Sequence, residues 1–219
     1  MSLRRGLQRV GPHWRAMSGG GSASCPALLD RPMPPSMDKP AWWKTGTVWE
    51  SMTPPWETLD GGQKKTADEL VSMRAACRLA REVLEEAGAH VRAGVTTQSI
   101  DDVVWDACMG RGVYPSPLNY SGFPRSVCTS VNDVVCHGIP SEGTTLVEGD
   151  LVNVDVTVFH EGFHGDNSMT LLVLKDGSLS DVPQQLPDEA MKFKDAANLM
   201  RVTQGALNAA IGTNRGKGK

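Results

Sequence analysis

A segment that alternates strictly between apolar and polar side chains constrains the fold of this chain more than any other feature. Residues 151–160 carry four valines on one side and three polar residues on the other: Val152, Val154, Val156 and Val158, and Asn153, Asp155 and Thr157. This alternation is typical of a half-buried strand. Glu161-Gly162 then indicates a tight turn, and residues 163–173 a returning strand. The sequence therefore predicts an antiparallel hairpin with one apolar and one polar face.

The hairpin predicts that two aspartates lie on its polar face. A two-residue turn pairs Thr157 with Asp166 and leaves Asp155 diagonal to Asp166, at a backbone separation of roughly 7–8 Å. Two facing carboxylates repel at neutral pH unless they share a proton or a cation lies between them, and carboxylate oxygens suit divalent metals. The alternative is one solvated acid and one acid satisfied by backbone donors. A three-residue loop would turn one strand over and separate the pair.

Residues 160–164 read H-E-G-F-H and match the H-E-x-x-H signature of helical zinc peptidases. That chemistry needs both histidines on one face of a helix. Gly162 lies in the middle of the motif, and both flanks alternate with period two. We therefore predict a hairpin turn, with His160 and His164 on opposite faces as solvated or turn-stabilising residues.

Helical patterns lie on both sides of the hairpin. Thr66 and Glu69 form a T-x-x-E capping box, and apolar residues then recur at spacings of three and four until Gly88, the expected C-terminal cap. Further elements are predicted as a helix at 98–109 capped by Thr97 and ended by Gly110 or Gly112, strands at 127–131 and 134–136, a polar loop at 177–187 and a helix at 188–211. The fold class predicted is α/β (α+β), an antiparallel sheet flanked by helices.

The N-terminal region differs in composition from the rest. Residues 1–29 contain four arginines and no acid, which resembles an organellar transit peptide; the alternative is a basic tail without an address. We divide the chain into a transit peptide or disordered tail (1–38), an extended arm (39–65), the main domain (66–211) and a disordered tail (212–219).

Composition also excludes several classes. The formal net charge of -3 gives no sign of a nucleic-acid partner, and no apolar run approaches the about 18 residues that span a membrane. Five cysteines without a C-x-x-C pair argue against a disulfide framework or zinc ribbon and indicate reduced thiols in an intracellular compartment.

A long motif then narrows the possibilities. Residues 122–140 read G-F-P-R-S-V-C-T-S-V-N-D-V-V-C-H-G-I-P, followed by G-D-L-V-N-V-D-V-T-V and G-F-H-G-D-N-S. The run resembles type 1 methionine aminopeptidases, and W-K-T-G-T-V at 43–48 resembles the start of their organellar subgroup. The likeness covers about residues 39–211.

The resemblance implies the pita-bread fold, in which two similar halves flank a centre of two divalent metal ions (Co, Mn, Fe or Zn). The activity implied is removal of the N-terminal methionine from nascent polypeptides. By resemblance Asp155 and Asp166 are metal ligands, and His137 is a catalytic residue that contacts the substrate near the scissile bond. Tyr120, Phe123 and Cys128 are implied to line the methionine pocket. The family often has Thr where Asn167 stands.

The resemblance also implies ligands that this sequence does not supply. The family takes a further histidine and two glutamates from its second half, whereas after Ile211 the sequence reads only G-T-N-R-G-K-G-K. We therefore expect the first half of the fold only, a truncated chain that is inactive as given. The alternative is a catalytically silent half-domain that binds peptide or protein. The expected location is mitochondrial, with plastid, or cytoplasm if there is no transit peptide, as alternatives.

Overall fold

The computed structural model describes residues 31–47, 64–181 and 186–214. Its helices and strands follow in the order α2 (Ala67–His90), α3 (Thr97–Arg111), β1 (Tyr114–Pro115), the 3-10 turn η3 (Tyr120–Gly122), β2 (Cys128–Val131), β3 (Leu151–His160), β4 (Phe163–Leu174), β5 (Gly177–Leu179), the 3-10 helix η4 (Asp188–Phe193) and α4 (Lys194–Asn214). None of the helices in this described part is long and apolar enough to span a membrane.

The sheet is antiparallel and centres on the predicted hairpin. Its strands lie in the order β1-β3-β4-β5, and β2 pairs with β3 as well. His160 pairs with Phe163, and Thr157 with Asp166, so the register predicted from the Glu161-Gly162 turn is confirmed. Both turn residues have positive φ, 49° and 82°, which a tight hairpin turn of this kind requires.

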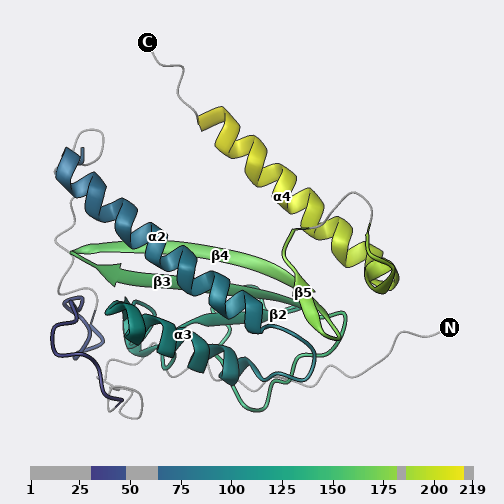
Figure 1. Cartoon of the computed structure of the whole chain (residues 1–219), viewed down its shortest axis with the longest axis horizontal. Helices are drawn as coiled ribbons and strands as arrows, with labels where there is room; N and C mark the ends of the chain where they lie inside the picture. Colours follow the sequence, from purple (N-terminus) through teal and green to yellow (C-terminus); the bar gives the residue numbers. More distant parts are fainter. Residues whose placement is uncertain (1–30, 48–63, 182–185, 215–219) are drawn as a thin grey trace.

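Helices α2 and α3 cover the apolar face of this sheet (Figure 1). The four valines of β3 are fully buried there and pack in one cluster with α2 residues such as Val83 and Leu84. Gly165 of β4 lies directly under α2, where an added Cβ would overlap the carbonyl oxygen of Ala76. The absence of a side chain at Gly165 therefore lets helix and sheet approach closely.

The predicted helix boundaries are mostly confirmed. Both hydrogen bonds of the predicted capping box are present: the Glu69 amide donates to the Thr66 hydroxyl, and the Thr66 amide donates to the Glu69 carboxylate. Gly88 is not the cap, because α2 continues to His90 and Gly88 lies buried inside it, next to the Met169 sulfur. Helix α3 begins one residue earlier than predicted, with Thr96 as its cap, and ends at Gly112 in the left-handed region.

Two sequence predictions about irregular segments are wrong. The segment 134–136 is not a strand but an exposed loop that follows β2. Its Val135 is 95% exposed, and no described strand pairs with the segment, so the strand propensity of its valines and cysteine does not decide its conformation. The predicted loop at 177–187 begins with β5, which adds a short edge strand beside β4.

The segment 31–47 packs on the domain. Its Met37 is buried with Trp105, Tyr114 and Leu118 in a second apolar cluster. Residues 31–38, which the sequence places with the tail, lie in the same packed segment as residues 39–47. The predicted domain boundaries therefore stay predictions, and residues 1–30 lie outside the described part.

Helix α4 stands apart from α2 and α3 (Figure 1). Its first turns pack on β4 through Ala197 and Met200. Four larger apolar side chains of α4 are more than half exposed: Leu199, Val202, Leu207 and Ile211.

Candidate metal centre

The polar face of the hairpin brings Asp155 and Asp166 together as predicted. Asp155 pairs with Ser168, and Thr157 pairs with Asp166, so the two aspartates are diagonal neighbours on adjacent strands. The Thr157 hydroxyl donates a hydrogen bond of 2.9 Å to Asp166 Oδ1. Residues 155, 157, 164, 166 and 168 share this face, because side chains alternate along each strand.

The two carboxylates are coupled electrostatically. Partial burial raises the pKa of Asp155, the negative charge of Asp166 raises it further, and His137 lowers it. A divalent cation beside both carboxylates would favour their charged forms by the same Coulombic effect. The pair therefore fits part of a divalent metal site. Within the described ranges, no group of three or more histidine, cysteine or acidic side chains is placed to hold a metal ion.

His137 lies on a loop that folds back onto β2. The Thr129 amide donates to the Gly138 carbonyl at 2.8 Å, and the Gly138 amide donates to Ser130 Oγ at 3.2 Å. A Cβ on Gly138 would overlap the Thr129 carbonyl, so only glycine permits this approach. His137 itself has a φ of 53°, in the left-handed region that is uncommon for a residue with a side chain. This backbone places an exposed imidazole where it acts electrostatically on Asp155.

Cys128 lies on β2 directly opposite Asp155. Burial, and then the nearby Asp155 carboxylate, raise the pKa of the Cys128 thiol to about 12, so it is a protonated, small apolar group at neutral pH. Tyr120 begins the η3 turn and Phe123 follows it as its C-terminal cap, where the Phe123 amide donates to the Tyr120 carbonyl at 3.0 Å. Tyr120 is 45% exposed and Phe123 half-buried. The roles implied for these three residues stay predictions.

His164 is a residue of this face to which the sequence assigned no role at the site. Its ring Nδ1 is hydrogen-bonded to Ser116 Oγ at 2.8 Å, and its ring stacks on Trp42. Partial burial of the ring lowers the pKa of His164, and the negative charge of Asp166 acts in the opposite direction. The period-two alternation that selected Asp166 also places His164 on the same face. The contact with Trp42 had no signal in the sequence, because it joins residues far apart in the chain.

A buried carboxylate also supports the loops around the site. Asp101 of α3 is fully buried; its Oδ1 accepts from the Ser126 amide at 2.6 Å, and its Oδ2 lies 4.0 Å from Arg125 Nε. Arg125 Nε donates to the Pro140 carbonyl at 3.2 Å, and Arg125 also donates to the Pro124 carbonyl at 3.1 Å. This pair therefore ties the segments that follow Phe123 and His137 to helix α3.

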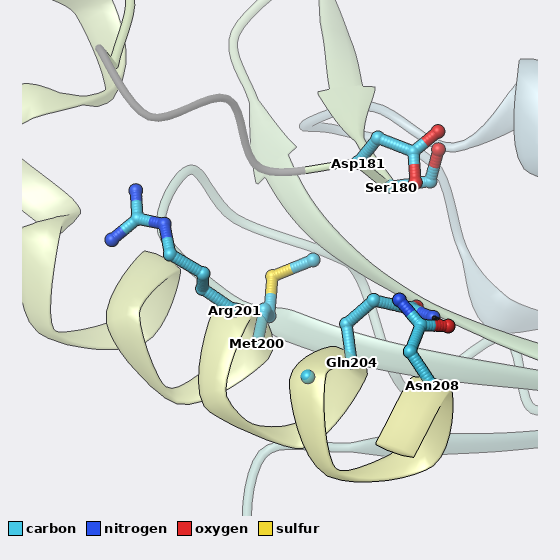
Figure 2. A pocket seen from close by; sticks show the side chains of 7 residues that line it. Ser180, Asp181, Met200, Arg201, Gln204 and Asn208 are labelled. Atoms are coloured by element: carbon cyan, nitrogen blue, oxygen red, sulfur yellow. Dashed lines mark hydrogen bonds between the residues drawn. The ribbon is translucent and has the colours of Figure 1, made fainter. Parts of the chain in front are cut away.

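Two hollows lie between the sheet and α4, beside the site rather than in it. A cavity of about 280 Å³ is lined by Ser180 and Asp181 and by five residues of α4: Met200, Arg201, Gln204, Gly205 and Asn208. Figure 2 shows Met200, Gln204 and Asn208 projecting from α4 toward Ser180 and Asp181. A larger groove of about 510 Å³ extends over the polar sheet face, along Asn153, Ser168 and Thr170. Neither hollow includes the two aspartates among its lining residues.

The family model of "Metallopeptidase family M24" matches residues 71–215. The chain belongs to this metallopeptidase family. It is 40% identical over 186 residues to methionine aminopeptidase 1D, mitochondrial, of Danio rerio, covering 84% of this chain and 52% of that protein. It is 44% identical over 157 residues to methionine aminopeptidase 1 of Saccharomyces cerevisiae, covering 71% of this chain and 40% of that protein.

A solved structure agrees with these relatives. The methionine aminopeptidase from Thermotoga maritima matches 68% of this chain and 53% of its own, with 29% identity and a TM-score of 0.56. The resemblance to type 1 methionine aminopeptidases and the expected fold class are confirmed. This M24 chain spans about half the length of the relatives it matches.

The structure also accounts for one departure from the family pattern. The side-chain amide of Asn167, where the family often has threonine, donates to the Cys77 carbonyl of α2 at 3.2 Å. Asn167 lies between Asp166 and Ser168 but points to the opposite face, so it helps to fix the strand under the helix without entering the site.

Proposed function

We propose that this chain provides part of a methionine aminopeptidase, an enzyme that hydrolyses the peptide bond after the N-terminal methionine of nascent polypeptides. The observation that carries this proposal is the diagonal pair Asp155 and Asp166, which occupies one polar sheet face in a chain of the M24 family. The names of its relatives support the substrate.

Each of these residues would have a separate role in the proposed hydrolysis. Asp155 and Asp166 would hold divalent metal ions (Co, Mn, Fe or Zn), which supply an activated water and a Lewis acid when bound. His137 would donate a hydrogen bond where negative charge develops on the scissile carbonyl. Tyr120, Phe123 and Cys128 would bind the methionine side chain, because an aromatic and thiol lining suits a flexible thioether.

A second candidate is a half-domain that binds a peptide or protein without hydrolysing it. One observation favours it: α4 exposes Leu199, Val202 and Leu207. The two candidates share the fold and differ in whether metal binding leads to turnover.

The test is Mn²⁺ titration of the purified chain by calorimetry, with Asp155→Asn and Asp166→Asn as variants. Each substitution removes a proposed ligand, so Mn²⁺ affinity should fall by more than about tenfold, the lower bound typical of residues that only support a ligand. Asp176→Asn, on the exposed β4–β5 turn, is the matched control and should bind as the unchanged chain does. Equal affinity in all four proteins would disprove the assignment of the pair.

Hydrolysis of a Met-Ala-Ser peptide with added Co²⁺ or Mn²⁺ then separates the two candidates. Turnover that Asp166→Ala abolishes favours the peptidase. We expect negligible turnover from these 219 residues alone, because two carboxylates leave most metal positions to water and fix the geometry poorly. Because little turnover is expected in either case, the binding half-domain is favoured by peptide affinity that does not depend on Mn²⁺ and is unchanged in Asp155→Asn and Asp166→Asn.

We further propose a mitochondrial location. The acid-free, arginine-rich residues 1–29 and the mitochondrial name of the Danio rerio relative support it. Residues 1–40 fused to a fluorescent protein should enter mitochondria. A signal confined to the cytosol would contradict this proposal.

A further inference from the structure

The segment 31–47 is called the arm from here on; it begins before the predicted arm of residues 39–65 and is held at several points around the candidate metal centre. The Asp38 carboxylate accepts from the Gly162 amide at the hairpin turn, at 3.1 Å. At the η3 turn, the Asn119 side-chain amide donates to the Trp43 carbonyl at 3.0 Å. The arm therefore bridges the two turns that flank the polar face of the sheet.

Between these two anchors the arm residue Trp42 contacts two residues of the site. Its indole stacks on the His164 imidazole, with ring centroids 5.2 Å apart and 13° between the planes. It also meets the Tyr120 ring edge-on, at 5.4 Å and 89°. Both are favourable geometries for aromatic pairs. Trp42 thus joins the strand that carries Asp166 to the turn that carries the implied pocket residue Tyr120.

The indole nitrogen of Trp42 does not hold the ring in this position. Trp42 Nε1 is shut off from solvent and has no hydrogen-bond acceptor among the described residues. A buried donor without an acceptor is unfavourable, so the ring contacts must outweigh that cost. Phenylalanine at this position would keep a ring against both partners and remove the unsatisfied donor.

His164 is consequently oriented from two sides. Ser116 holds its Nδ1, and Trp42 covers one face of the ring. Its strand neighbour on the same face is Asp166, which is itself held by Thr157. His164 remains exposed, as the sequence suggested, but a side chain with its ring plane and one nitrogen fixed is also a preorganised group.

We propose that Trp42 is a positioning residue of the substrate pocket. It stacks on His164 and contacts Tyr120 edge-on, and through these contacts the arm becomes part of the site. The arm lies outside the family match at residues 71–215, so a segment that the family model does not include completes one wall of the pocket. This inference rests on the proposed function, because it assigns Tyr120 to the binding of the methionine side chain.

The test compares Trp42→Ala, Trp42→Phe and Trp43→Phe in the Mn²⁺-loaded chain, with the Met-Ala-Ser peptide as the probe. Trp42→Ala should weaken peptide binding by about threefold to tenfold, the value of one or two aromatic contacts. Mn²⁺ affinity without peptide should change less than about twofold, because no proposed ligand is touched. Trp42→Phe should restore most of the peptide affinity. Trp43→Phe is the matched control: the same change at the next arm residue, which packs in the Met37 cluster instead.

A spectroscopic measurement tests the contact itself. Stacking on Trp42 should shift the His164 ring protons upfield in the NMR spectrum, with His164→Asn identifying the signals. The shift should survive Trp43→Phe and become smaller in Trp42→Ala, where the Phe159 ring, 4.8 Å away, still acts on His164. Unchanged peptide affinity in Trp42→Ala, an equal loss in Trp43→Phe, or no rescue by phenylalanine would overturn the proposal.

The two proposals fail in different ways. If the unchanged chain shows no Mn²⁺-dependent peptide binding, the proposed function fails. The positioning of His164 is then decided by the NMR signal alone, and an unshifted signal would overturn it. Peptide binding that Asp155→Asn abolishes and Trp42→Ala leaves intact would keep the function and refute the role of Trp42.

Discussion

The two faces of the β3–β4 hairpin come from alternating residues of the same strands, yet they meet different surroundings. On the helix side, the valines of β3 are fully buried under α2 and α3, and Gly165 allows the helix backbone to touch the sheet. On the other side, Asp155 is half-buried and Asp166 exposed. The comparison indicates that the helix face supplies stability, while the polar face is left free for ligands.

The largest effect is expected from Gly165→Ala on the helix side. The added methyl group would overlap the backbone of Ala76 and Cys77, which can retreat only if α2 moves as a whole. Overpacking of this kind costs about 3 kcal/mol or more when backbone must shift. Urea unfolding should show the loss. Gly177→Ala is the control, since nothing lies within 4 Å of its added Cβ, and an equal loss there would contradict the prediction.

A smaller effect is expected from Val156→Ala, also on the helix side. The change removes two buried methyl groups at a fully buried position, which should cost about 2 kcal/mol when the cavity is included. Val135→Ala makes the same change at a side chain that is 95% exposed, and unfolding should shift by less than about 0.5 kcal/mol. Similar losses at both positions would mean that the helix face is not the main source of stability.

The sequence predicted the hairpin well because its signals were local. Alternation placed the valines and aspartates on opposite faces, and the Glu161-Gly162 turn set the register between the strands. The capping box at Thr66 and Glu69 likewise fixed the start of α2. Each of these features depends on residues that are near one another in the chain, or on a turn that makes them so.

The features that could not be predicted depend on distant contacts. Glycine is common at helix ends, so Gly88 was predicted as a cap. In the structure Gly88 lies inside α2, and the Met169 side chain of β4 packs against it. Residues 134–136 had strand propensity, but no strand in the described part of the chain pairs with them. Trp42 and His164 are separated by the whole of α2, α3 and three strands, so nothing local indicated their stacking. Propensity is overridden where tertiary packing decides the conformation.

A smaller effect, dependent on pH, is expected from a buried acid on the helix side. Asp101 is fully buried on the helix side, and burial raises its pKa above the ordinary value of 3.8, although the Ser126 amide and Arg125 lower it. A raised folded-state pKa means that this stabilising contribution is complete below pH 3.8 and is lost as pH rises through the folded pKa. Relative to Asp101→Asn, which does not titrate, the unchanged chain should lose stability between acidic and neutral pH.

The measurement is the difference in unfolding free energy between the unchanged chain and Asp101→Asn at acidic and neutral pH. Subtracting the two proteins cancels the other titrating groups that they share. A difference that does not depend on pH, or that favours the unchanged chain more at neutral pH, would show that burial does not dominate at Asp101. The loops at Ser126 and Pro140 should keep their arrangement in the variant, because an asparagine oxygen can still accept from the Ser126 amide.

The smallest effect on stability is expected on the polar face, from Thr157→Val. The change preserves the shape of the side chain and removes the one hydrogen bond to Asp166, worth about 0.5–1 kcal/mol at an exposed position. Valine also favours a strand, which offsets part of this loss. If the polar face serves ligands, the same change should lower Mn²⁺ affinity by about tenfold, because Asp166 loses the group that orients it. Calorimetric titration beside urea unfolding measures both quantities on one sample. A large loss of stability with unchanged Mn²⁺ affinity would reverse the comparison and make Thr157 a structural residue.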